Sequence, residues 1–174
     1  MSGYRKLGRA SNQREAILKN MTTAFVINGK LETTVARAKE ISAITEKLVT
    51  LAVKEKDNYD TKEITVSSAK LDAKGKKVLI TKTSKNGKPY EVVDREVKTK
   101  TVQVDKPSRL AARKQMSYWL MKSHDSEGNT VNPVNKMFDE IAPKYVDRKG
   151  GYTRVTKIGA RRGDGSEMAI LEFV

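Results

Sequence analysis

Apolar residues recur at intervals of three and four positions between residues 35 and 51, which is the period of an α-helix with one buried face. This face consists of Val35, Ala38, Ile41, Ile44, Leu48 and Leu51. The charged residues fall on the remaining faces and are Arg37, Lys39, Glu40, Glu46 and Lys47. The pattern predicts a core helix with one solvent-exposed side, preceded by a short strand whose last residue, Thr34, caps the helix N-terminus.

Two longer helices are predicted on either side of this one. The first covers residues 12–28, where Asn12 and Glu15 resemble a capping box and Asn28-Gly29 ends the helix. Its apolar face is Ala16, Ile17, Met21, Ala24 and Phe25. The second begins near Pro107 and extends to about Lys122. We expect its core residues to be Leu110, Ala111, Met116, Trp119 and Leu120, and its outward residues to be Arg109, Arg113 and Lys114.

The sequence pattern of the C-terminal third predicts a short helix followed by a β-hairpin. After a loop at 126–130, residues 131–141 form a helix that uses Val134, Met137, Phe138 and Ile141 and is stopped by Pro143. Strands at 151–158 and 168–174 are joined by the Gly-rich turn at 161–165 and form a three-stranded sheet with residues 30–34. The expected fold class is α+β in two layers, with helices packed on one face of a small three-stranded mixed sheet.

Residues 57–105 differ in composition from the rest of the chain. They are rich in Thr, Val and Lys and contain short alternating runs at 63–67, 78–82, 90–93 and 99–104, with turn signals at Lys74-Gly75 and Asn86-Gly87. The pattern predicts a β-rich insertion, a hairpin or small antiparallel meander, within a single domain of 174 residues. The alternative is a solvated, disordered loop, because the segment has few apolar residues for a core of its own.

The net charge of +14 and the isoelectric point near 9.9 indicate a polyanionic partner. Basic side chains that meet phosphates release condensed counterions, so nucleic acid is the leading candidate. Residues 57–105 hold eleven Lys and Arg against eight Asp and Glu, so most of the excess charge lies elsewhere. The sequence shows no basic amphipathic helix with aromatic residues on its apolar face, no leader and no membrane-length apolar stretch, and we expect a cytoplasmic protein without membrane binding.

Candidate phosphate-binding residues gather in a basic N-terminal arm at residues 1–10, on the helices, and most densely at 144–162. Arg37 and Lys39 lie near a helix N-terminus, where the helix dipole favours anions, so an external polyanion explains them best. Gly150-Gly151 allows a close backbone approach to phosphate, and Tyr152 offers a ring for stacking. The alternative for each group is a solvated surface. The RNA-binding candidates are Arg5, Lys6, Arg9, Arg14, Lys19, Arg37, Lys39, Arg113, Lys114, Arg148, Lys149, Tyr152, Arg154, Lys157, Arg161 and Arg162.

The sequence offers no arrangement of residues that is typical of catalysis or metal binding. The chain has no Cys and a single His, His124. No carboxylate or nucleophile lies at a spacing from His124 that is typical of a catalytic site. Gly163-Asp164-Gly165 joins two predicted strands and is therefore a hairpin connection rather than a phosphate-binding loop. We therefore expect that the protein is not an enzyme and that it binds no cofactor, metal or small-molecule substrate.

A set of motifs, in order along the chain, resembles the bacterial large-subunit ribosomal protein seventeen family. They are Tyr4-Arg5-Lys6-Leu7-Gly8-Arg9, Gln13-Arg14, Asn20-Met21, Leu31-Glu32-Thr33-Thr34, Ala36-Arg37-Ala38-Lys39-Glu40, the tail at 46–52, residues 138–143 and Gly150-Gly151-Tyr152-Thr153-Arg154. The resemblance covers residues 3–56 and 106–174 and leaves out 57–105.

The resemblance implies a structural component of the large ribosomal subunit, on its solvent side near the polypeptide exit tunnel. Its partners would be ribosomal RNA and neighbouring ribosomal proteins, held by charge and shape, and nothing in the sequence indicates base-specific reading. The alternative is a free-standing RNA-binding or RNA-modifying factor.

The family joins the elements that flank residues 57–105 by a short connection, so this segment is expected to leave and re-enter the domain at nearly one point. Its near balance of charge predicts that it projects into solvent or toward a neighbouring ribosomal protein. The rival hypothesis is that this segment is a loop that penetrates the RNA. It is supported best by a group of basic residues, Lys70, Lys74, Lys76, Lys77 and Lys82.

Overall fold

The computed structural model describes residues 5–124 and 128–174. The chain divides into two compact units, one formed by the residues up to Asn58 together with Asp105–Val174, the other by Tyr59–Val104. Residues 1–4 of the predicted basic arm and 125–127, which include part of the predicted loop, lie outside the described residues. The first unit carries the helices and the main sheet, and the second is built from strands alone.

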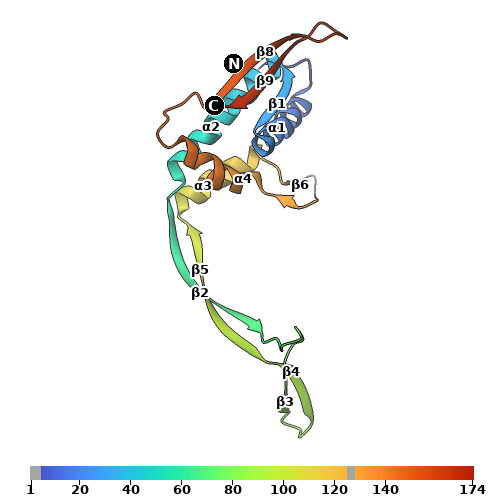
Figure 1. Cartoon of the computed structure of the whole chain (residues 1–174), viewed down its shortest axis with the longest axis vertical. Helices are drawn as coiled ribbons and strands as arrows, with labels where there is room; N and C mark the ends of the chain where they lie inside the picture. The colour runs from blue at the N-terminus through green and yellow to red at the C-terminus, as the bar shows by residue number, and fades with distance from the viewer. Residues whose placement is uncertain (1–4, 125–127) are drawn as a thin grey trace. The chain divides into compact units, whose positions relative to one another are not determined.

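The main sheet has the strands β1 (Lys30–Thr34), β8 (Thr153–Ala160) and β9 (Glu167–Phe173) in the order β1-β9-β8 (Figure 1). Leu171 of the central strand pairs with Leu31 on one side and with Val155 on the other. Both pairings are antiparallel, so the prediction of a mixed sheet is wrong. The reason is the strand order: β1 and β8 run in the same direction, but β9 lies between them.

The helices α1 (Ser11–Asn28) and α2 (Val35–Glu55) cover one face of this sheet (Figure 1). Thr33, Ala169 and Leu171, which alternate with exposed or half-buried neighbours, are buried beneath them. Phe25 of α1 stacks on Phe173 of β9 with ring centroids 4.4 Å apart. The two-layer α+β fold class expected from the sequence is confirmed.

Helix α2 confirms the predicted apolar stripe, since Ala38, Ile41, Ile44 and Leu48 are buried. The stripe is wider than expected, because Thr45, Val49 and Ala52 are buried as well. Thr34 has the extended backbone of an N-cap residue, but its side chain makes no capping hydrogen bond, so that part of the prediction is wrong. The amides of the first turn of α2 therefore have no side-chain cap.

Helix α1 occupies almost the predicted range, and Gly29 ends it in the left-handed conformation (φ 74°). Its buried face differs from the expected one and is Leu18, Thr22, Thr23, Phe25 and Val26. Two threonines are buried here, and the hydroxyl of Thr23 donates to the carbonyl of Lys19 and accepts from the amide of Met121. The capping box is also absent, because Glu15 pairs with Lys19 instead.

Helix α3 (Pro107–Trp119) is three residues shorter than expected. Met116 and Leu120 are buried as predicted and Trp119 is half-buried against the core. Arg109 and Ala112 are buried as well, whereas Leu110 and Ala111 are exposed. Arg109 is buried because Asp105 offers it a carboxylate and its guanidinium lies 4.9 Å from the ring centroid of Phe138. A charged side chain with such partners displaced the apolar residues that periodicity alone places in the core.

Beyond α3, the short strands β6 (Ser123–His124) and β7 (Thr130–Val131) pair antiparallel. The predicted helix at 131–141 is a continuous but irregular run: α4 (Pro133–Lys136), a π-helical turn (Met137–Ile141) and a 3₁₀ turn (Ala142–Tyr145). Val134, Met137, Phe138 and Ile141 are buried as predicted. Pro143 lies within the 3₁₀ turn, so it does not stop the run where the sequence suggested.

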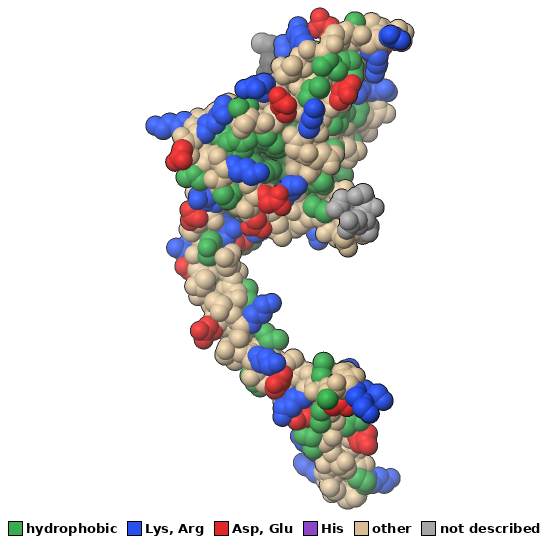
Figure 2. Space-filling view, viewed as in Figure 1, with side chains coloured by type: hydrophobic (Ala, Val, Ile, Leu, Met, Phe, Trp, Pro, Cys, Tyr) green, Lys and Arg blue, Asp and Glu red, His purple; other side chains and the backbone are tan. Residues whose placement is uncertain are grey.

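The second unit contains the four predicted strands as β2 (Tyr59–Ala69), β3 (Leu79–Thr83), β4 (Pro89–Val93) and β5 (Arg95–Asp105). They form two separate pairs, β2 with β5 and β3 with β4, rather than a meander. The inner hairpin follows the expected Asn86-Gly87 turn, with Gly87 at φ 73°. None of residues 59–104 is buried, and hydrophobic side chains lie at the surface of this unit (Figure 2).

Candidate nucleic-acid interface

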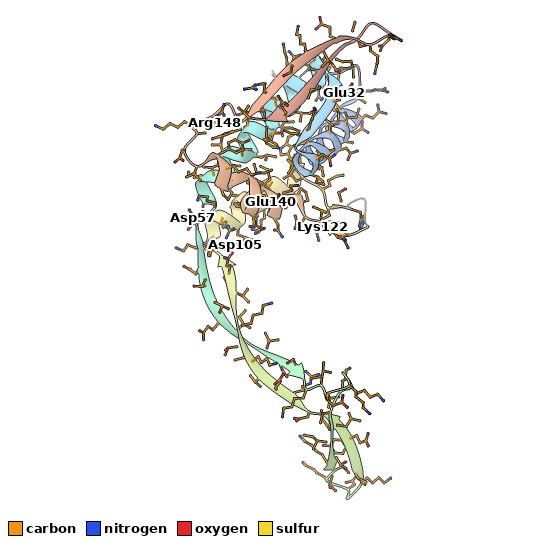
Figure 3. All side chains as sticks on the ribbon, in the orientation of Figure 1. Glu32, Asp57, Asp105, Lys122, Glu140 and Arg148 are labelled. Atoms are coloured by element: carbon orange, nitrogen blue, oxygen red, sulfur yellow. The ribbon has the colours of Figure 1, made fainter. Side chains whose placement is uncertain are left out.

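The two ends of the second unit meet at one point of the first. The amide of Lys106 donates to the carbonyl of Asn58 at 3.2 Å, and Figure 3 shows Asp57 and Asp105 beside each other there. The side chain of Asn58 also donates to Ser108 and to Glu55 Oε2. These bonds hold the residues on either side of segment 59–104 close together within the first unit.

Six of the basic candidates already have partners within the chain. Arg5 pairs with Glu40 at 2.8 Å, Lys157 with Glu167 at 3.3 Å, and Arg148 Nε donates to the carbonyl of Gly150 at 3.1 Å. The other three are Lys19, Arg113 and Arg161, described below. An ion pair at the surface is weak, so such a residue can still meet a phosphate, but it must first give up its own partner.

Arg113 is a structural residue rather than a free surface cation. Its Nε lies 2.7 Å from Asp105 Oδ2, and its Nη1 donates to Asn135 Oδ1 at 2.7 Å. Its guanidinium lies 5.0 Å from the ring centroid of Phe138, beside that of Arg109. These contacts join α3 to α4 and to the end of β5, and the assignment of Arg113 to RNA binding from its outward position is not supported by this geometry.

The hairpin turn holds Arg161 in a two-point contact with Asp164. Arg161 Nε donates to Asp164 Oδ1 at 2.9 Å, and the second guanidinium nitrogen contacts Oδ2. The hydrogen bond from Arg161, helped by Ser166, holds the pKa of Asp164 well below its usual range, and the same bond raises the pKa of Arg161. Both groups are therefore charged at neutral pH, and the turn presents a paired rather than a free cation.

Tyr152 does not offer the stacking surface expected of it. The residue is only 3% exposed, its hydroxyl donates to the carbonyl of Arg148, and its ring packs edge-on against Tyr145. The ring belongs to the core, so this geometry does not support the prediction that Tyr152 stacks on RNA. Its bond to Arg148 instead shapes the loop that carries Arg148 and Lys149.

Nine candidates have no side-chain partner among the described residues. They are Lys6, Arg9, Arg14, Arg37, Lys39, Lys114, Lys149, Arg154 and Arg162. They come from the arm, from α1, α2 and α3, and from the hairpin with the loop before it. Figure 2 shows Lys and Arg side chains distributed over the first unit. These basic side chains are spread over several elements of the first unit rather than gathered in one closed site.

The arm, the N-terminus of α2 and the far end of the β8–β9 hairpin meet around one open hollow of about 440 Å³. It is lined by two basic residues, Arg5 and Lys39, by the acidic Glu167, and by Thr34, Val35, Ala36 and Ser166. The uncapped first turn of α2 adds the positive end of a helix dipole to these cations. The hollow thus brings together residues that are far apart in sequence, two of them basic and one acidic.

Among the described residues, no helix is long and apolar enough to cross a membrane. In the same part of the chain, no group of three or more His, Cys, Asp and Glu side chains comes together as a metal site would require.

The sequence profile of the family described as "Ribosomal protein L17" matches residues 17–174. The chain belongs to the ribosomal protein L17 family. It is 59% identical to the large ribosomal subunit protein bL17 of Ruminiclostridium cellulolyticum and 57% identical to that of Acetivibrio thermocellus, in each case over the full length of both chains. The bL17 protein of Clostridium acetobutylicum is 37% identical over 99% of this chain and 98% of its own length.

These matches correct one expectation about the L17 family. Residues 57–105 appeared to lie outside the resemblance, but the profile and the aligned relatives run through them. The second unit is therefore shared with those relatives and is not peculiar to this chain. Motifs on the helices and the hairpin identified the family, while the Thr-, Val- and Lys-rich strands carry no short motif by which to recognise it.

Proposed function

We propose that this protein is a structural constituent of the large ribosomal subunit that binds and stabilises ribosomal RNA. The observation that carries the proposal is the set of nine unpartnered basic side chains spread over the first unit, in a member of the L17 family with a net charge of +14. Each side chain that meets a phosphate releases counterions and adds to affinity without reading sequence. The relatives named large ribosomal subunit protein bL17 support the assignment.

The protein contributes no catalysis in this role. Its family is structural, and its acidic groups serve as partners for arginine and lysine, as Asp105 does for Arg113 and Asp164 for Arg161. RNA segments are held in place by charge neutralisation and by the rigid α2 and sheet core behind the basic surface. The protein would work in the cytoplasm as part of the ribosome, on the solvent side of the subunit near the exit tunnel, beside other ribosomal proteins.

The second unit is proposed to be an accessory part of the domain that reaches toward a neighbouring ribosomal protein. Seven of its large hydrophobic residues are strongly exposed: Ile64, Val66, Leu71, Leu79, Ile80, Tyr90 and Val97. Exposed aliphatic surface of this kind suits a protein partner better than a phosphate backbone. The hydrogen bond between Lys106 and Asn58 joins the residues that flank the second unit. Because lengthening such a loop costs little chain entropy, the unit can contain many residues without destabilising the first unit.

Sedimentation of cell extract on sucrose gradients distinguishes a subunit component from a free-standing RNA-binding factor. A structural constituent co-migrates stoichiometrically with large subunits and stays bound after a high-salt wash, because many phosphate contacts and a folded RNA surface hold it. A factor would leave the particles as salt rises. Loss from the particles in high salt would overturn the proposal.

A further inference from the structure

We propose that a hollow between the first half of α1 and the end of α3 holds one unpaired nucleobase of the bound RNA. The hollow has a volume of about 150 Å³ and is lined by Ser11, Arg14, Glu15, Leu18, Tyr118 and Trp119. The proposal rests on the RNA-binding function proposed above and adds a defined contact to it. Periodicity assigns Trp119 to the core, against which it is half-buried, and does not predict that its ring also lines a hollow.

Two aromatic rings form one side of the hollow. The rings of Tyr118 and Trp119 lie edge to face at 90°, with centroids 5.3 Å apart, and Tyr118 is 53% exposed. Lys19 Nζ lies 3.8 Å from the Tyr118 centroid, yet Lys19 does not line the hollow. Both rings line the hollow, and half of the Tyr118 side chain remains exposed with Lys19 over its ring. Exposed aromatic surface beside basic side chains is the usual platform for an unstacked base.

Glu15 explains why the occupant is a base rather than a phosphate. Its Oε1 accepts from Tyr118 and from Lys19, which lies 2.7 Å away, and these bonds lower the pKa of the carboxyl, the Lys19 bond most. The ionised carboxylate is part of the lining of the hollow and disfavours a phosphate there. Its other oxygen, Oε2, is left to accept from an amino or imino group on the edge of a base.

Two further lining residues on α1, Arg14 and Ser11, supply the cation and the donor that such a nucleotide needs, and Lys114 lies nearby on α3. Arg14 and Ser11 lie one turn apart on α1, and Lys114 lies one turn before Tyr118 on the exposed side of α3. Arg14 has no side-chain partner among the described residues, so its guanidinium is available to stack on the base or to meet the flanking phosphate. A nucleotide carries a phosphate that can pair with these cations as well as a base that can stack, whereas a neutral or acidic peptide does not offer both.

Trp119 is the single tryptophan of the chain, so its fluorescence reports on the hollow directly. The full-length protein is titrated with purified large-subunit ribosomal RNA, with a single-stranded oligoribonucleotide and with inorganic polyphosphate. We expect both RNAs to quench Trp119 emission and polyphosphate to leave it unchanged, since polyphosphate has charge but no base.

Variants at Tyr118 test the same contact by affinity. In filter binding to ribosomal RNA, Tyr118→Leu should bind roughly 5- to 150-fold more weakly, the range for losing one base–aromatic stack, whereas Tyr118→Phe keeps the ring and most of the affinity. Tyr90→Leu, at an exposed tyrosine of the second unit, is the matched control and should bind like the wild type. Circular dichroism establishes that each variant is folded, which is expected because Tyr118 is half exposed.

The outcomes separate this site from the proposed function. If ribosomal RNA binds with steep salt dependence while Trp119 emission and Tyr118→Leu affinity are unchanged, the base site is overturned and the function stands. If ribosomal RNA does not bind, both are overturned. If Trp119 emission responds to isolated large-subunit proteins but not to RNA, the hollow is a protein contact and the assignment to a nucleotide is wrong.

Discussion

Asp105 Oδ2 lies 2.7 Å from Nε of Arg113, and the other oxygen of the same carboxylate lies 3.1 Å from Nη1 of Arg109. Both guanidinium groups lie over Phe138, so a single carboxylate at the end of β5 fixes two arginines of α3 against an aromatic ring. The side chain of Arg109 is almost fully buried, which means that its charge depends on this arrangement. The relationship fixes the first half of α3 against the π-helical turn that carries Phe138, within the first unit.

The first prediction is that Asp105→Asn strongly destabilises the protein. Breaking a buried ion pair leaves an uncompensated charge, and we expect a loss of about 3 kcal/mol in the free energy of unfolding, at the low end of the usual range because Asp105 is partly exposed. Urea denaturation followed by circular dichroism measures it. Asp139→Asn, at an exposed carboxylate of the π-helical turn, is the control and should be nearly neutral.

The second prediction contrasts two leucines that periodicity alone places together in the core. Leu48→Ala in α2 removes a side chain that is 3% exposed and should cost about 2 to 5 kcal/mol of stability. Leu110→Ala in α3 removes one that is 45% exposed and should cost far less. Thermal unfolding of the two variants compares them. Equal losses would mean that the burial of α3 is misassigned.

The third prediction concerns pH and the hairpin turn. The pKa of Asp164 is depressed in the folded protein by its bond to Arg161, so the ionised pair stabilises the turn above the ordinary carboxyl pKa near 3.9 and is lost only as pH falls through the lower folded value. Carbon-detected NMR titration of the Asp164 carboxyl should show a midpoint well below that of a model peptide. In Arg161→Gln the midpoint should return toward the ordinary value; a depressed midpoint in that variant would show that Arg161 is not the cause.

The fourth prediction follows from the absence of buried residues at 59–104. Two-stranded pairs without a covering layer are only marginally stable, so the amides of β2 to β5 should exchange with solvent at little cost in the free protein, while those of α2 are protected to near the global stability. Hydrogen exchange read by mass spectrometry tests this. The same peptides should gain protection in assembled subunits. Strong protection in the free protein would contradict the inference that this unit needs a partner.

The sequence predicted the parts of the fold in which local pattern and tertiary packing agree. The stripe of α2, the C-terminal hairpin and the four strands of the second unit follow from periodicity and from turn residues such as Asn86-Gly87. In helix α3, Met116 was predicted correctly in the core, but the burial of Arg109 was missed because it depends on Asp105 and Phe138, which lie outside the helix. No pattern within α3 contains that information.

The candidate RNA-binding residues were predicted from their charge, and charge alone does not reveal which of them form ion pairs within the chain. Arg113 and Arg161 look like surface cations in the sequence but are held by Asp105 and Asp164. Tyr152 follows two glycines in a basic stretch and looks exposed, yet its ring packs on Tyr145. Conversely, Tyr118 and Trp119 lie beside Arg14 only because α1 and α3 pack together, and the sequence places Arg14 and Tyr118 far apart.

The central claim is that unpartnered basic side chains of the first unit contact RNA phosphates. It is tested most directly by the salt dependence of binding to large-subunit ribosomal RNA in a variant with Lys149, Arg154 and Arg162 changed to Gln. The control variant changes Lys157 and Arg161, which lie on the same hairpin but already pair with Glu167 and Asp164. We predict that the log–log salt slope of the first variant flattens by roughly 0.7 to 0.9 for each residue removed, and by less per residue in the control. An unchanged slope in the first variant would contradict the claim.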